Sequence, residues 1–124
     1  MNIWIRLGAL GGGMGVLLGA FAAHSLKKIL TPKSLEVFQT ATQYLTVHSL
    51  ALILVGILAM HASEADRKRI NRAGKFFSAG ILLFSGSLYA LAFDGPRFFG
   101  PITPLGGLSL ITAWTLLAFS IKGK

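Results

Sequence analysis

Two histidines and a tyrosine in the first half of this sequence are of types that bind ligands or move protons. Tyr44 and His48 are four residues apart, so a helix would place them on one face, with Glu36 two turns before Tyr44 and Gln43 beside the line. His24, one of the two other histidines of the chain, precedes this stretch. Imidazole can exchange a proton near neutral pH or serve as an axial ligand of haem iron. These residues form the candidate polar site of the chain.

Three hypotheses can explain this polar site. In the first, the side chains only pack, and they fix the helix register by hydrogen bonding across helices. In the second, the chain is a minimal oligomeric transporter or channel, in which His48 relays a proton and Glu36 guards the outer mouth. In the third, a b-type haem is held between His24 and His48. The residues expected to satisfy one another under the first hypothesis are Gln43, Tyr44, His48, Ser85, Ser87 and Thr112.

Packing is the favoured hypothesis, because no acidic residue lies deep in an apolar segment and the histidine spacing does not select haem over an empty bundle. No catalytic residues are predicted, since the sequence has no Ser/His/Asp arrangement, phosphate-binding loop or paired carboxylates. The absence of cysteine excludes disulfides and thiolate metal sites. We therefore predict no metal, no cofactor and no enzymatic activity.

The elements that must position these residues are long and apolar. The chain is 53% hydrophobic and 13% charged, whereas charged residues make up about a quarter of ordinary soluble proteins. Four uncharged windows approach or exceed the roughly 20 residues that span a bilayer. A soluble bundle would need polar outer faces, which the third and fourth windows lack. We predict a single all-α domain, residues 1–124, folded as a four-helix transmembrane bundle with spans at about 5–24, 38–60, 76–93 and 103–121.

The first apolar segment is unusually rich in glycine. It has the outline of a signal peptide, but so many glycines are atypical of one, so we expect a retained helix. Glycines four residues apart let another backbone come close, which is how membrane helices associate. We expect this groove to face the chain's own helices. The glycines assigned to helix packing are Gly8, Gly11, Gly12, Gly15 and Gly19.

Local signals predict where helices begin and turn. Thr31 with Pro32, and Thr103 with Pro104, each look like an N-cap followed by proline at the first helical position. The sequence Asp94-Gly95-Pro96 predicts a turn. Both Thr-Pro starts would then lie on the same side of the membrane.

Residues 63–75 are expected to form a charged connection between the second and third spans. Its basic residues are an orientation signal that also touches anionic lipid, or, on a sharper hypothesis, a specific lipid or partner site. With four spans, eight Lys and Arg lie on the side of the termini and four on the other, which predicts cytoplasmic termini. Nucleic acid is not an expected partner, because no soluble domain presents the +8 net charge. The basic residues of the connection are Arg67, Lys68, Arg69, Arg72 and Lys75.

Four stretches resemble the domain-of-unknown-function family 423, small four-span bacterial membrane proteins with a eukaryotic counterpart. They are GAFAAH from Gly19, FQTATQYLTVHSLAL from Phe38, SGSLYAL from Ser85 and GPITPLGGLSLITAW from Gly100. Ala22 departs from the pattern, where glycine is expected, but keeps the position small. The resemblance covers nearly the whole chain and implies a four-helix protein of the bacterial cytoplasmic (inner) membrane. It implies no reaction.

We therefore predict a small multi-pass membrane protein that acts as a non-catalytic interaction or accessory protein. Its expected partners are the lipid bilayer, including anionic lipid at the charged connection, and either further copies of itself or another membrane protein. The transporter and haem hypotheses remain the alternatives.

Overall fold

The computed structural model describes residues 2–122 of the chain. Lys124, which is counted among the basic residues that predict the orientation, lies outside this range. Every regular element in this range is helical. The elements are α1 (Ile3–Phe21), the π-helical segment η1 (Ala22–Leu26), α2 (Lys27–Ile29), α3 (Pro32–His61), α4 (Glu64–Ala92) and α5 (Phe99–Ala118). Since α1, η1 and α2 run on as one segment, the described residues contain four helices long and apolar enough to cross a membrane. This confirms the predicted all-α, four-span fold.

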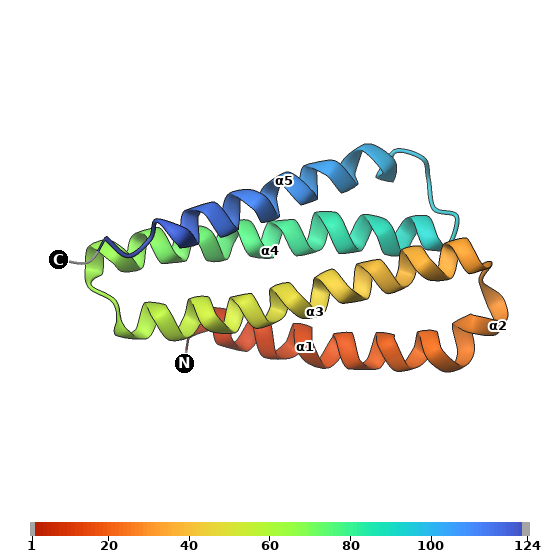
Figure 1. The fold of residues 1–124 in the computed structure, drawn as a ribbon, viewed down its shortest axis with the longest axis horizontal. Helices are drawn as coiled ribbons and strands as arrows, with labels where there is room; N and C mark the ends of the chain where they lie inside the picture. Colours follow the sequence, from red (N-terminus) through yellow and green to blue (C-terminus); the bar gives the residue numbers. More distant parts are fainter. Residues whose placement is uncertain (1, 123–124) are drawn as a thin grey trace.

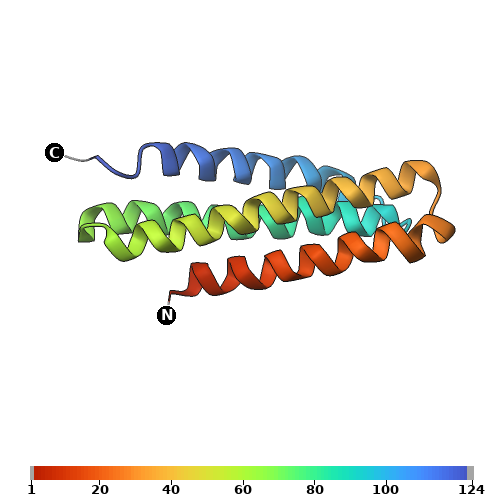
Figure 2. The ribbon, with the colours of Figure 1, turned by 60° about the horizontal axis from the view of Figure 1, so that its bottom comes forward.

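The four long helices run antiparallel to their sequence neighbours (Figure 1). The pair α3 and α4 lies in the middle, with α1 packed against α3 and α5 against α4. Figure 2 shows α1 and α5 on opposite sides of this central pair. The start of α1, the end of α5 and the α3–α4 connection share one end of the bundle, which we call the basic end because the Arg67 to Lys75 segment begins there. The other is called the opposite end.

Capping interactions set the start of both central helices. The Thr31 hydroxyl accepts a hydrogen bond from the Ser34 amide at 3.1 Å, and Pro32 occupies the first turn, which confirms the predicted start of α3. The Ser63 hydroxyl accepts from the Asp66 amide at 3.2 Å in the same way. The α3–α4 connection is therefore only two residues long, and the expected charged connection is instead the first three turns of α4.

The predicted start of α5 at Thr103 and Pro104 is wrong. The helix begins at Phe99, and Pro104 lies inside it. The Thr103 hydroxyl does not cap the helix but donates to the Phe99 carbonyl at 3.3 Å and contacts the Ser87 hydroxyl at 2.5 Å. Pro104 lies in the second turn of α5, so the helix lacks the hydrogen bond that an amide at this position would donate to the Gly100 carbonyl.

The turn predicted at residues 94–96 precedes α5. Asp94 has a φ of 58°, in the left-handed region, and the Gly95 amide donates to the Ala90 carbonyl at 2.8 Å. The confirmed turn leads directly into the short link to Phe99.

Buried side chains form two clusters, one toward each end of the bundle. The cluster nearer the basic end contains Val55, Ile70 and Phe77, which are fully buried. The cluster nearer the opposite end contains Leu26 and Phe38. Most of the remaining large apolar side chains point outward, which suits a lipid environment. The candidate polar site lies between the two clusters on α3.

Candidate functional site

His48 is buried and joins two helices through its ring. Its side chain is 5% exposed, Nδ1 lies 2.7 Å from the Tyr44 carbonyl oxygen, and Nε2 accepts a hydrogen bond from the Trp114 indole at 3.1 Å. An indole can only donate and a carbonyl can only accept, so the ring carries its proton on Nδ1 and is neutral. Both ring nitrogens are thus used within the chain. To take up a proton or bind a metal, Nε2 would have to release Trp114.

Aromatic rings from three helices surround the imidazole. The Tyr44 ring stacks on it with a centroid distance of 5.6 Å, and Phe77 of α4 and Trp114 of α5 lie at 5.9 and 5.8 Å. Phe77 and Trp114 also contact each other edge to face at 4.9 Å. Edge and stacked arrangements of this kind add about 0.5–1.5 kcal/mol per pair beyond apolar burial. His48 of α3 therefore contacts both α4 and α5 at one point.

A hollow of about 330 Å³ opens beside this ring. We call it the α3 notch; it is lined by Gln43, Tyr44, Val47, His48 and Trp114. Tyr44 is 39% exposed there, with its ring against Phe84 at 4.4 Å. Within residues 2–122 neither the Gln43 amide nor the Tyr44 hydroxyl makes a hydrogen bond.

The α3 notch lies near the middle of its helix. A helix of 30 residues is about 45 Å long, and its centre falls between residues 46 and 47. Gln43, Tyr44 and His48 are therefore within about 6 Å of the centre, at the depth where lipid cannot supply hydrogen bonds.

The remaining residues of the predicted site lie elsewhere. His24 and Glu36 are both exposed near the opposite end. Gly19 lies beside Thr42, which places His24 at about the level of residue 37 on α3, roughly 16 Å along the axis from His48. The structure does not bring the two histidines together, and both ring nitrogens of His48 are already engaged. Among the described residues no group of three or more His, Asp or Glu side chains could hold a metal.

Hydrogen bonds across helices are present, but with partners that differ from those expected. Ser85 donates to the Ala41 carbonyl at 2.8 Å, and Ser87 contacts Thr103, whereas Thr112 bonds only within its own helix. The expected mutual network of Gln43, Tyr44 and His48 with the serines does not form. Ser85 instead bonds a backbone carbonyl of α3, and Ser87 bonds a hydroxyl of α5.

Sequence reasoning did not assign polar partners to two aromatic residues. Trp114 bonds His48, and the Tyr89 hydroxyl shares a 2.8 Å hydrogen bond with Thr42. A signal was available, because an indole N–H or phenol O–H within a membrane span needs a partner. What the sequence could not give was which partner lies opposite.

The glycines of α1 divide into two groups. A Cβ on Gly8, Gly11 or Gly15 would collide with Ser49, Ile53 or Thr46 of α3, so these positions allow the close approach of the two helices. A Cβ on Gly19 would make ordinary contact with Thr42 at 4.0 Å. Gly12 and Gly13 have no neighbour within 4 Å. Gly12 was expected to pack against another helix of the chain, but no such helix within residues 2–122 lies against it.

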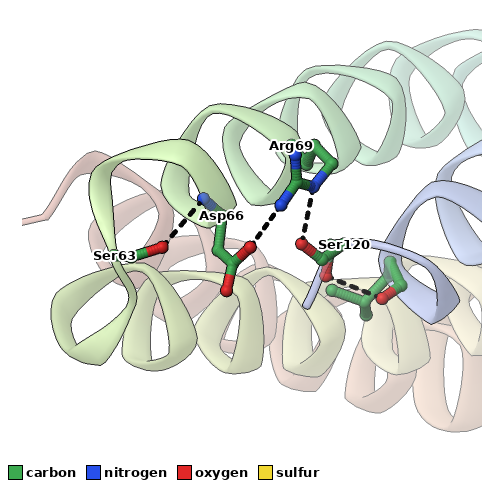
Figure 3. A network of polar contacts seen from close by, with 5 residues as sticks. Ser63, Asp66, Arg69 and Ser120 are labelled. Carbon is green, nitrogen blue, oxygen red and sulfur yellow. Dashed lines mark hydrogen bonds and ion pairs between the residues drawn. The ribbon is translucent and has the colours of Figure 1, made fainter. Parts of the chain in front are cut away.

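The five basic residues at the start of α4 also divide. Arg67 donates to the Ala59 and Ala62 carbonyls, each at 3.0 Å, and so covers the end of α3. Arg69 pairs with Asp66 and donates to the Ser120 carbonyl at 2.9 Å, which ties α4 to the end of α5 (Figure 3). The other three basic residues, Lys68, Arg72 and Lys75, are exposed.

Comparison with known proteins identifies relatives along the full length of the chain. The family described as "Protein of unknown function (DUF423)" matches residues 18–107. A UPF0382 membrane protein of Haemophilus influenzae is 41% identical over 124 residues, covering 99% of this chain and 97% of its own. UPF0382 membrane protein YwdK of Bacillus subtilis is 41% identical, and a UPF0382 membrane protein of Staphylococcus saprophyticus 42%, each covering 94% of both chains. No solved structure matches.

Proposed function

The chain belongs to the DUF423 family, as a multi-pass protein of the bacterial cytoplasmic membrane, and we propose that it acts as a non-catalytic interaction or accessory protein. The observation that carries this proposal is the position of Gln43. Its amide is exposed near the middle of a membrane-spanning helix and has no hydrogen-bond partner within residues 2–122. An amide left unpaired in hydrocarbon costs several kcal/mol.

Gln43 begins a row of side chains that suits helix pairing. The residues are spaced alternately by four and three along α3, as in the contact seam of a left-handed helix pair. Their exposed fractions run from 44% to 60% for the four apolar members. We call this row the α3 seam; it consists of Gln43, Val47, Leu50, Leu54 and Ile57.

A partner helix lying along the α3 seam would satisfy Gln43. Interhelical hydrogen bonds of polar side chains in membranes contribute about 0.6–2 kcal/mol each. A single polar residue among apolar ones also fixes the register of a helix pair. The apolar members would supply packing, and Gln43 would supply specificity.

The orientation of the protein is part of this proposal. Because basic residues concentrate near cytoplasmic ends of spans, the basic end and both termini are placed in the cytoplasm. The positive charge of the first turns of α4 supports this placement.

Electrophoresis under native conditions tests the proposal. Membranes containing the wild-type chain, extracted in mild detergent, are expected to show an assembly larger than the 13.2 kDa subunit. Gln43→Leu should shift it to smaller species, while Thr112→Leu, an exposed change on α5, should leave it intact. A wild-type chain that migrates as a monomer, or an assembly unaffected by Gln43→Leu, would contradict the proposal.

A second candidate function is a minimal oligomeric transporter. It is favoured by the α3 notch, because four of its lining residues, Gln43, Tyr44, His48 and Trp114, can form hydrogen bonds at mid-membrane depth. Against it, both His48 nitrogens are already engaged. Proton or cation flux into proteoliposomes that is lost in Tyr44→Phe and His48→Phe would favour this candidate over an interaction protein.

A further inference from the structure

Three of the basic residues of α4 share one face of the helix. Lys68, Arg72 and Lys75 follow one another at intervals of four and three residues, and Asn71 lies between them. Together with Asn71 they line a hollow of about 300 Å³. We call this row the basic stripe. It is distinct from Arg67 and Arg69, whose guanidinium groups are engaged with backbone carbonyls.

The positive charge of the basic stripe is not neutralised within residues 2–122. The acidic residues nearby are Glu64 and Asp66, and Asp66 pairs with Arg69. No ion pair joins Glu64 to Lys68, although the two are four residues apart on one helix. Three cations on one helical face therefore lack an anion.

The basic stripe runs from the end of the bundle toward the hydrocarbon. Lys75 is 11 residues beyond the start of α4, or about 16 Å along its axis, and Phe76 beside it is 38% exposed. The Trp4 indole donates to Asn71 at 2.8 Å, and its ring lies against Gly74. Tryptophan favours the boundary between headgroups and acyl chains. The stripe therefore lies at headgroup depth.

An apolar groove continues from this point into the membrane. It is a hollow of about 230 Å³ between α1, α3 and α4, which we call the α1–α4 groove. Leu7 lies about one turn beyond Trp4 on α1, and Ser78 lies about one turn beyond Gly74 on α4. Leu82, two turns after Lys75 and 75% exposed, forms part of its wall. The full lining is Leu7, Gly11, Leu45, Ser49, Leu52, Ser78, Ile81 and Leu82.

From these two features we infer that the protein has a specific site for an anionic phospholipid, with the phosphate on Lys68, Arg72 and Lys75 and an acyl chain in the α1–α4 groove. The order of the two features matches the structure of a phospholipid, because a charged surface at headgroup depth is followed by an apolar groove deeper in the bilayer. A free phosphate would use only the stripe. This site shares no residue with the α3 seam.

Native mass spectrometry in mild detergent tests this inference. The protein is titrated with phosphatidylglycerol and with phosphatidylethanolamine of the same chains, and the bound lipid is counted. The stripe variant is K68Q/R72Q/K75Q, and the control K27Q/K28Q/R97Q removes the same charge near the opposite end. Each basic residue contributes about 1 kcal/mol to binding an anionic lipid, so the loss of all three should weaken phosphatidylglycerol binding on the order of 100-fold. The control should stay within about threefold of wild type.

Two further arms separate an intact lipid from a free anion. Soluble glycerol phosphate should fail to displace phosphatidylglycerol at equal concentration, and Leu82→Trp, a change at the exposed groove wall, should weaken binding of the lipid. Circular dichroism checks that each variant retains its helices. Equal binding by wild type and the stripe variant, or equal losses in stripe variant and control, would overturn the site. Displacement by glycerol phosphate would overturn the assignment to a phospholipid.

Discussion

Breaking the contact between His48 and Trp114 should loosen α5 from the rest of the bundle. His48→Phe keeps a ring of similar size but removes the hydrogen bonds to the Tyr44 carbonyl and to Trp114. Trp114→Phe removes the indole donor from a side chain that is 42% exposed. Hydrogen bonds of this kind in membranes average about 0.6 kcal/mol and reach about 1.7 kcal/mol. Each single variant should therefore lower the free energy of unfolding by about 1–2 kcal/mol.

The double variant isolates the contact itself. If the two side chains stabilise the fold through each other, the effects of His48→Phe and Trp114→Phe will not add, and their coupling energy should be about 0.6–1.7 kcal/mol. Because the chain has no cysteine, Ala113→Cys can be introduced in every variant as the sole thiol, at a position that is 0% exposed. Its alkylation rate during titration with SDS reports the opening of α5.

Thr112→Val is the matched control, since it removes a hydrogen bond within α5 and none between helices. It should change the unfolding free energy by less than about 0.5 kcal/mol. A coupling energy below about 0.3 kcal/mol between His48 and Trp114 would refute the view that this pair sets the helix register.

Other substitutions test further contacts by thermal unfolding in detergent. Gly106→Ala should destabilise by about 1–3 kcal/mol, because its Cβ would meet the backbone of Phe84, whereas Gly86→Ala, with open space around it, should be neutral or slightly stabilising. Tyr89→Phe should cost about 0.6–1.7 kcal/mol by removing the bond to Thr42, and no loss would argue against that bond. Arg69→Gln should speed hydrogen exchange near Ser120, and an unchanged exchange rate would contradict its tie to α5.

Helix number and the start of α3 could be predicted from the sequence, because both depend on local chemistry. Uncharged length sets a span, and Thr31 with Pro32 caps whatever helix follows. The same reasoning failed at Thr103, where an identical signal lies inside a helix. There the threonine hydroxyl contacts Ser87 of α4, a tertiary interaction that local spacing does not reveal.

The candidate site could be predicted only in part for the same reason. The sequence placed Tyr44 and His48 on one face of a helix, and their rings stack in the structure. It did not show that Trp114, 66 residues further on, engages the second nitrogen of His48. Nor could it show that Arg67 and Arg69 bond backbone carbonyls, whereas Lys68, Arg72 and Lys75 stay exposed. That division depends on α4 beginning at Glu64, so that the charged residues follow helical periodicity.

Photo-crosslinking in native membranes tests the proposed role of the α3 seam most directly. A photoreactive side chain is placed at Gln43 or, as a control, at Leu108, which is 60% exposed on α5. Contacts of Gly106 with Phe84 and of Ser85 with Ala41 put Leu108 at nearly the depth of Gln43. We expect a discrete protein adduct at position 43 and only lipid adducts at position 108. Lipid adducts alone at position 43 would show that the seam faces the bilayer and would contradict the proposed interaction.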